Sequence, residues 1–252
     1  CAYRALVGLA EGGAADDDPR KLAVAVECFH KASLIHDDIE DADAARYDTH
    51  TLHVEHGVPV ALNVGDLLLG EGYRLIAECR CGSGRKVEML RAAAEGHRTL
   101  CLGQGAELCW ARSPRPLTSA EVLDIFRRKT APAFDVALHL GATLAGAGEN
   151  VHEILSRYSD ALGAAYQIRD DLDDFASEKG SGTCSKSHAA HLDRPNILLA
   201  LAGETAAGDD ATLVDQLWRT RPSAGRDGEI ASLLERTGAA RRAEELMETY
   251  KQ

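Results

Sequence analysis

Asp37-Asp38-Ile39-Glu40-Asp41 is one half of the most informative pattern in this chain, and Asp170-Asp171-Leu172-Asp173-Asp174 is the other half. Both stretches have the form Asp-Asp-x-x-Asp, and each ends a segment with helical periodicity. Residues four apart share one face of a helix, so each cluster stacks like charges, which destabilises the helix unless a cation compensates. Mg²⁺ binds through a few carboxylates and leaves coordination positions for phosphate oxygens. Two such clusters facing each other predict a clamp for metal ions and a diphosphate.

The residues before each cluster predict that the carboxylates point inward. Apolar positions recur at steps of three and four and lead to Asp37 in the first case and to Asp170 in the second. The two stripes are Leu22, Val26, Phe29 and Ser33, and Leu155, Tyr158, Leu162 and Tyr166. A lone acidic pentamer is usually a solvated patch, but two matching clusters on inward stripes argue against that reading, because buried carboxylates require counter-ions.

The rest of the chain also predicts helices. The alternation typical of strands is almost absent, Ala and Leu are abundant, and aromatic residues make up only 5%. Helices are expected at 59–79, 85–109, 119–145 and 197–202, with Thr118 as the N-cap of the third. Breaks are expected at 82–84, 113–116, 146–150 and 180–187. None of these breaks is long enough for a domain linker, which predicts one all-α domain over residues 1–252.

Composition narrows the possible partners. The net charge of −12 over 252 residues argues against nucleic acid or an anionic membrane as a general partner. The longest apolar run, at 136–148, is short and contains His139, so no membrane-spanning segment is predicted. The chain begins with Cys1 and not with Met, so we expect the natural start to lie upstream.

The seven cysteines favour a reducing, cytoplasmic location. Their number is odd, their spacing is irregular, and no Cys-x-x-Cys occurs. Cys79 and Cys81 followed by His97 match no common zinc-site spacing, so unpaired structural thiols are the better interpretation.

Four motifs occur in a fixed order. Leu34-Ile35-His36 precedes the first cluster, Gln167-Ile168-Arg169 precedes the second, and between them lie Gly65-Asp66-Leu67-Leu68 and Lys129-Thr130. From about Glu27 to Phe175 this order and spacing resemble the trans-isoprenyl diphosphate synthases, also called polyprenyl synthetases.

The resemblance implies an antiparallel bundle of helices around a deep central cavity, and a homodimer. It implies three Mg²⁺ ions and an enzyme that condenses an allylic diphosphate with isopentenyl diphosphate to give a longer trans-prenyl diphosphate. The implied metal ligands and catalytic residues are Asp37, Asp38, Asp41, Asp170, Asp171 and Asp174, with Lys129 as a further catalytic residue. The implied substrate-binding residues are Arg46, Lys129, Thr130, Gln167, His30 and Arg194.

The chain departs from the family pattern on the side of the second substrate. Tyr47 stands where the family has an arginine for isopentenyl diphosphate, and a phenol cannot supply the charge or fork of a guanidinium. The family's upstream Gly-Lys-x-x-Arg segment would fall before Cys1. His30 matches the third element of that site, or is an interior histidine with a backbone partner. After Phe175 the family's lysines are out of register, and Arg194 is the candidate substitute for the last of them.

Three hypotheses therefore stand. The chain is an active prenyltransferase, a terpene-synthase-like lyase that ionises a single prenyl diphosphate, or a non-catalytic subunit of a heteromeric synthase. The intact acidic clusters argue against the third. If the first holds, residues one and two turns before Asp37 set the length of the product. Ala32 and Ser33 would let a tail pass and Phe29 would form a floor, which predicts products longer than fifteen carbons, around twenty by analogy with the family.

Overall fold

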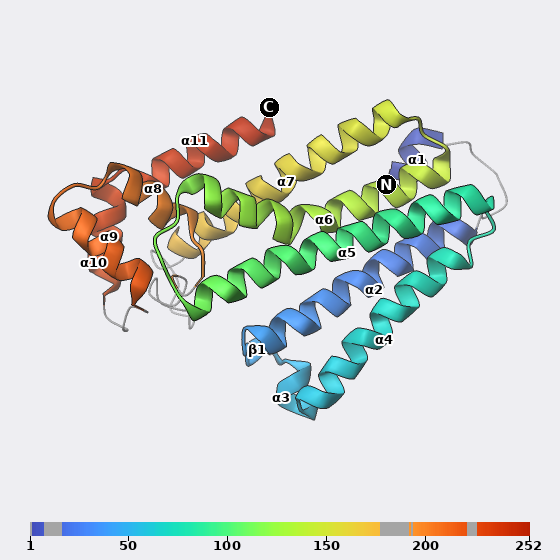
Figure 1. Ribbon diagram of the computed structural model, residues 1–252, viewed down its shortest axis with the longest axis horizontal. Coiled ribbons are helices and arrows are strands. Elements are labelled where there is room, and N and C mark those ends of the chain that lie inside the picture. Colours follow the sequence, from blue (N-terminus) through green and yellow to red (C-terminus); the bar gives the residue numbers. More distant parts are fainter. Residues whose placement is uncertain (1, 8–16, 177–191, 193, 221–225) are drawn as a thin grey trace. The chain divides into compact units, whose positions relative to one another are not determined.

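The computed structural model describes residues 2–7, 17–176, 192, 194–220 and 226–252 (Figure 1). Its helices are α1 (Ala2–Val7), α2 (Asp17–Glu40), α3 (Leu52–His56), α4 (Val58–Ala77), α5 (Ser83–Arg112), α6 (Ser119–Ala145), α7 (Glu149–Ala176), α8 (Ile197–Thr205), α9 (Asp209–Arg219), α10 (Asp227–Arg236) and α11 (Ala239–Lys251). The strands found in these ranges are β1 (Ala45–Arg46) and β2 (Thr49–His50). The all-α prediction is confirmed.

The predicted helices match α4, α5, α6 and α8 closely, and α6 has the predicted bounds. Its start shows why a local signal sufficed. The Thr118 hydroxyl accepts a hydrogen bond from the Glu121 N–H at 3.2 Å, and the Glu121 carboxylate accepts one from the Thr118 N–H at 2.9 Å, which is a capping box. The break expected at 180–187 lies outside the described residues.

The chain divides into two compact units. The first contains residues 1–96 and 135–155, and the second contains 97–134 and 156–252, so α5, α6 and α7 contribute to both. Each unit has its own apolar core, built around Ile76, Met89 and Leu140 in the first and around Phe126, Ile168 and Leu199 in the second. The single domain and the deep central cavity stay predictions.

Helices α2 and α4 form an antiparallel pair in the first unit (Figure 1). Two glycines of α4 allow the close approach. A Cβ atom at Gly72 would overlap the ring of Phe29, and one at Gly65 would overlap the ring of His36. The two rings are seven residues apart in α2 and the two glycines are seven residues apart in α4, so the two contacts lie two turns apart along the same helix pair. Phe29 also meets Tyr73 edge to face, with ring centroids 5.0 Å apart.

The segment after α2 reverses the chain twice. The N–H of Asp43 bonds to the carbonyl of Asp38, and that of Ala42 to the carbonyl of Ile39, which is a Schellman motif. Ala42 occupies the left-handed position, with φ of 54°, where glycine is usual. Strands β1 and β2 then form an antiparallel hairpin whose tip residues, Tyr47 and Asp48, have φ of 51° and 61°. Positive φ at both tip residues is typical of a type I′ turn.

Helix α8 is the core element of the second unit. Every side chain from Ile197 to Ala202 is buried, and α9, α10 and α11 pack against this helix (Figure 1). Trp110 of α5 and Trp218 of α9 meet edge to face, with centroids 5.6 Å apart. In the described ranges, no helix combines the length and the hydropathy needed to cross a bilayer.

Ala42→Gly is predicted to stabilise the protein by about 1 kcal/mol, because glycine adopts the left-handed conformation without steric cost. Urea denaturation followed by circular dichroism measures the change. The matched control is Ala94→Gly, which makes the same replacement at an exposed position inside α5. It is expected to destabilise by about 1 kcal/mol, because glycine is a poor helix former. Equal loss of stability in both variants would contradict the role given to Ala42.

Candidate active site

The first acidic cluster lies at the end of α2 and presents its three aspartates differently. Asp38 is buried, with an exposed fraction of 6%, whereas Asp37 is half-buried and Asp41, just after the helix, is exposed. Arg46 donates to Asp38 Oδ1 from Nε at 2.7 Å and approaches the same oxygen with Nη2 at 2.6 Å. Burial opposes the charge of Arg46, but the hydrogen bond to Asp38 and the nearby Asp43 and Asp37 raise its pKa overall. The short hairpin thus delivers a fixed guanidinium to this cluster.

The Gly65-Asp66 motif has a physical role in the first unit. Gly65 leaves room for the His36 ring, and the exposed Asp66 carboxylate lies 3.5 Å from His36 Nε2. That nitrogen is buried and makes no hydrogen bond to any described residue. Gly65 and Asp66 therefore position His36, the residue immediately before Asp37.

The second cluster lies at the end of α7, in the second unit. Asp171 is buried, with an exposed fraction of 2%, and its Oδ2 accepts a hydrogen bond from the N–H of Ile197 at 2.7 Å. That N–H belongs to the first turn of α8, where Asn196 also caps the N–H of Leu199 at 3.1 Å. The outer aspartates, Asp170 and Asp174, are half-buried.

Arg194, the candidate substitute for the last family lysine, lies at the second cluster. Its Nη2 donates to Asp174 Oδ2 at 2.8 Å. Burial raises the pKa of Asp170 to about 6 and that of Asp171 to about 7, and in both cases the positive charge of Arg194 opposes the rise. Repulsion from Asp174 adds to the rise at both residues. Crowded carboxylates with a raised pKa form a place where a further cation would be stabilising.

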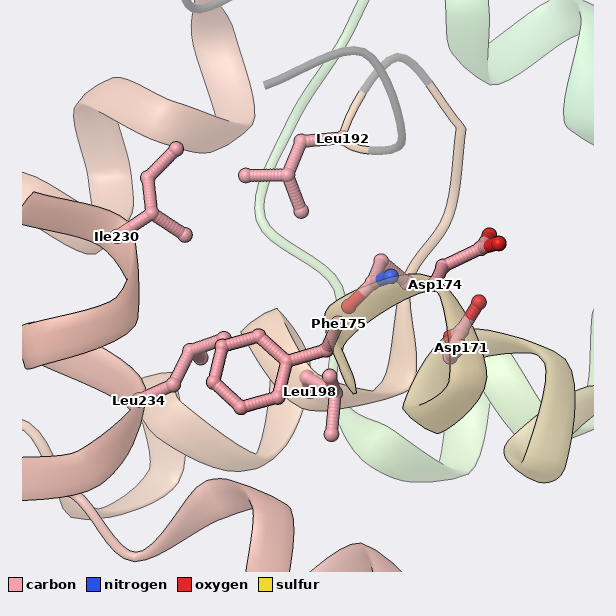
Figure 2. Close-up of a pocket in the computed structure, with 8 residues that line it drawn as sticks. Asp171, Asp174, Phe175, Leu192, Leu198, Ile230 and Leu234 are labelled. Atoms are coloured by element: carbon pink, nitrogen blue, oxygen red, sulfur yellow. The ribbon is translucent and has the colours of Figure 1, made fainter. Parts of the chain in front are cut away.

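A pocket adjoins this cluster. Asp171 and Asp174 lie on one side of it, and Ile230 and Leu234 of α10 lie on the other (Figure 2). The remaining lining consists of the apolar side chains of Phe175, Leu192 and Leu198 and the polar side chain of Asn196. The pocket therefore has carboxylates on one side and mostly apolar side chains on the other.

One feature is common to both clusters. The second aspartate of each, Asp38 or Asp171, is buried and holds a neighbouring segment of the protein. The first and last aspartates keep more exposure. These contacts suit Asp38 and Asp171 to positioning the clusters. The predicted metal-binding role of all six aspartates stays a prediction.

The predicted inward stripe of α7 is wrong. Tyr158 and Tyr166 have exposed fractions of 56% and 50%, whereas Ser159, Ala164 and Ile168 are fully buried, on the face that leads to Asp171. The physical reason is close helix packing. A Cβ atom at Gly163 would come within 2.7 Å of the Ala131 backbone, so small residues of α7 face α6 and the larger aromatic rings do not. In α2 the predicted stripe is half-buried after Leu22, and the fully buried positions are Ala25 and Ala32.

The Lys129-Thr130 pair makes two side-chain contacts in the second unit. Lys129 Nζ donates to Glu107 Oε1 at 2.8 Å, and Thr130 Oγ1 accepts from Gln167 Nε2 at 2.8 Å. The structure therefore brings Thr130 and Gln167 together. Glu107 was missed by sequence reasoning. The available signal was that a lysine in an otherwise apolar helix needs a counter-charge.

The other predicted site residues are less enclosed. His30 is exposed, and Tyr47 has an exposed fraction of 79% at the hairpin tip. Of the residues predicted to set product length, Phe29 contacts Gly72 and Tyr73 of α4, Ala32 is completely buried, and Ser33 donates to the His30 carbonyl at 2.8 Å. Their predicted functions stay predictions.

The donor set fits Mg²⁺ of the substrate-linked kind. No three His, Cys, Asp or Glu side chains converge on one point in the described part of the chain. The first and last aspartates of each Asp-Asp-x-x-Asp pattern keep some exposure, and carboxylate oxygens are the ligands that Mg²⁺ prefers. Mg²⁺ commonly binds in this way, through one or two carboxylates, water and substrate phosphates. The clusters lie in different units, so their pairing across one ligand stays a prediction.

Comparison with known proteins identifies the family. The polyprenyl synthetase family matches residues 2–224, and the chain therefore belongs to it. The short chain isoprenyl diphosphate synthase of Methanocaldococcus jannaschii is 32% identical over 157 residues, which are 62% of this chain and 47% of that protein. The geranylgeranyl diphosphate synthase of Sulfolobus acidocaldarius is 32% identical over 149 residues, 59% of this chain and 45% of that protein.

A solved structure agrees with the fold. The polyprenyl synthase from Caulobacter crescentus, described as complexed with calcium and isoprenyl diphosphate, has a TM-score of 0.81 and 27% identity. The similarity covers 99% of this chain and 73% of that one. In sequence, by contrast, the chain spans about half the length of the two archaeal relatives.

Asp171→Asn is predicted to change how stability depends on pH. A carboxyl group whose pKa is raised on folding favours the folded state at low pH, and that contribution is lost as pH rises from about 4 through 7. The asparagine variant lacks this loss and still offers an oxygen to the Ile197 N–H. Its stability relative to the unchanged protein should therefore improve between pH 5 and pH 8 by a few kcal/mol, at about 1.4 kcal/mol per pKa unit.

Urea denaturation with EDTA present measures this change. Asp173→Asn is the control, because Asp173 is exposed and forms a surface ion pair with Arg169 at 3.2 Å. The same pH dependence in both variants would contradict the burial argument.

Proposed function

We propose that the chain is a Mg²⁺-dependent trans-prenyltransferase that joins an allylic diphosphate to isopentenyl diphosphate. The observation that supports this most directly is the pair of aspartate clusters, each with a buried anchoring aspartate and more exposed outer ones. Family membership supports the same reaction class. Asp37 and Asp41 would hold metal at one cluster, and Asp170 and Asp174 at the other.

Bound Mg²⁺ would supply positive charge to the diphosphate oxygens as the carbon–oxygen bond breaks. The protein's own cations would act on the same group. Arg46 is fixed by Asp38, Arg194 is fixed by Asp174, and Lys129 is fixed by Glu107. Donors that are already oriented lose little freedom when charge develops on the leaving group. Thr130 and Gln167, bonded to each other, would complete the polar surface.

The product is proposed to exceed fifteen carbons, at around twenty. Ala32 and Ser33 are small, and Phe29 follows one turn deeper along α2. The name of the Sulfolobus acidocaldarius relative, a geranylgeranyl diphosphate synthase, is consistent with this length. A homodimer belongs to the same proposal and is supported by the resemblance. A cytoplasmic location is supported by the free thiols of Cys28, Cys79, Cys81 and Cys109 in the described part of the chain.

Tyr47 favours a second candidate function. It occupies the strained hairpin tip, exposed, where the family pattern places an arginine for isopentenyl diphosphate. A chain that has lost this cation could act on one prenyl diphosphate alone, as a lyase. The retained clusters argue against the third hypothesis, a non-catalytic subunit, since crowded carboxylates carry a cost that metal binding would offset.

Incubation with Mg²⁺ and an allylic diphosphate, with and without isopentenyl diphosphate, tests the proposal. Longer prenyl diphosphate formed only with both substrates is the expected result. Hydrocarbon or alcohol from one substrate would favour the lyase, and rescue only by a partner chain would favour the subunit. Asp174→Asn should lower turnover about a hundredfold or more. Asp173→Asn, the same change one residue away on an exposed side chain, should leave it within about twofold.

Tyr47→Arg is expected to lower the KM for isopentenyl diphosphate about tenfold, because a guanidinium adds a charge-assisted contact to diphosphate. Steady-state kinetics at saturating allylic substrate measure the change. The matched control is Tyr47→Gln, which removes the phenol without adding charge and should leave the KM near its original value. A KM that responds equally to both replacements would show that this position does not meet the second substrate.

A further inference from the structure

Glu107 is a buried acidic side chain that the resemblance left without a role. It lies on α5 with an exposed fraction of 7%, and its Oε1 accepts a hydrogen bond from Lys129 Nζ at 2.8 Å. The Lys129 side chain is itself only 18% exposed. A buried charge is costly unless it is paired, so the ammonium and the carboxylate depend on each other for their positions.

The surrounding helices leave this ion pair little freedom. A Cβ atom at Gly103 would lie 2.6 Å from the backbone nitrogen of Lys129, so the backbones of α5 and α6 approach each other closely at that point. Glu107 is four residues after Gly103 and therefore on the same face of α5, one turn from the contact. On the other side of α6, Gly163 brings α7 equally close to Ala131. The pair thus joins α5 and α6 near a close contact of these helices, and α6 is itself closely packed against α7.

A neighbouring polar group has no partner. Gln104 precedes Glu107 by three residues, on the same side of α5, and has an exposed fraction of 5%. Neither its amide oxygen nor its amide nitrogen makes a hydrogen bond with any part of the chain that the structure describes. Buried amides are almost always hydrogen-bonded in proteins, so this one indicates that a polar ligand or water belongs beside the ion pair.

We propose that Glu107 is a positioning residue, which holds the Lys129 ammonium at the place where a diphosphate oxygen binds. The inference deepens the proposed function and rests on it. A lysine side chain has four flexible carbons and would otherwise turn its strongly hydrated ammonium toward solvent. Glu107 prevents this, and the ammonium meets the diphosphate already oriented.

The test compares Glu107→Gln with a matched control, Asp124→Asn. Asp124 forms an ion pair at 2.8 Å with Arg128, the residue before Lys129, on the exposed side of α6. The control therefore removes one negative charge from the same region of this helix. The measurements are calorimetric affinity for inorganic pyrophosphate with Mg²⁺, and the KM for the allylic diphosphate. Glu107→Gln should weaken both about ten- to a hundredfold, and Asp124→Asn should change neither. Equal values for the two variants would overturn the proposal.

A double variant separates positioning from simple structural support. In Glu107→Leu with Lys129→Met, both charges are replaced by apolar groups of similar size, which is often neutral for stability. The Tm of the double variant should be close to that of the unchanged protein, while its affinity for pyrophosphate should be as low as that of Lys129→Met alone. Recovery of affinity along with the Tm would show that the pair only supports the fold, and would overturn the proposal.

The same data distinguish failure of this inference from failure of the proposed function. If the unchanged protein binds pyrophosphate with Mg²⁺ but does not form an elongated prenyl diphosphate, the transferase activity is refuted. The pyrophosphate affinities of the variants then still decide the role of Glu107. If turnover is present and Glu107→Gln behaves as the control does, only the positioning role is refuted. Absence of pyrophosphate binding by the unchanged protein would overturn both.

Discussion

Burying a carboxylate is costly without a partner, and this constraint organises the chemistry of the chain. Asp38 is buried with a hydrogen bond from Arg46 of the hairpin. Asp171 is buried with a hydrogen bond from the Ile197 N–H at the start of α8. In each case the partner is a segment that follows the acidic cluster in sequence. Asp38 and Asp171 therefore each fix a segment of the chain that follows their cluster.

This arrangement divides the work within each cluster. An aspartate that is bonded inside the protein is fixed, and its neighbours one turn away inherit that rigidity. Asp170 and Asp174 lie one turn apart at the end of α7. Burial, and to a smaller extent repulsion from Asp174, raises the pKa of Asp170 to about 6. Preorganised anions of this kind lose little freedom when a cation binds, which is the property a metal-assisted diphosphate site requires.

Sequence signals within one segment predicted the helices well. Contacts between segments could not be predicted from the sequence. The bounds of α6 follow from a capping box and a glycine after its end, both legible in sequence. The buried face of α7 was misassigned because hydropathy favoured Tyr158 and Tyr166, whereas the helix packs through small residues such as Gly163. Glu107 escaped notice because its partner, Lys129, lies on another helix, and periodicity within one segment carries no information about contacts between segments.

The two tryptophans make the intrinsic fluorescence of the protein a probe of the second unit. The chain has only Trp110 and Trp218, and both lie in the core of the second unit, stacked edge to face. Intrinsic indole emission is therefore blind to the first unit, including the α2–α4 pair. A tryptophan fluorescence melting curve reports the core of the second unit. Its comparison with far-ultraviolet circular dichroism reveals whether both units unfold together.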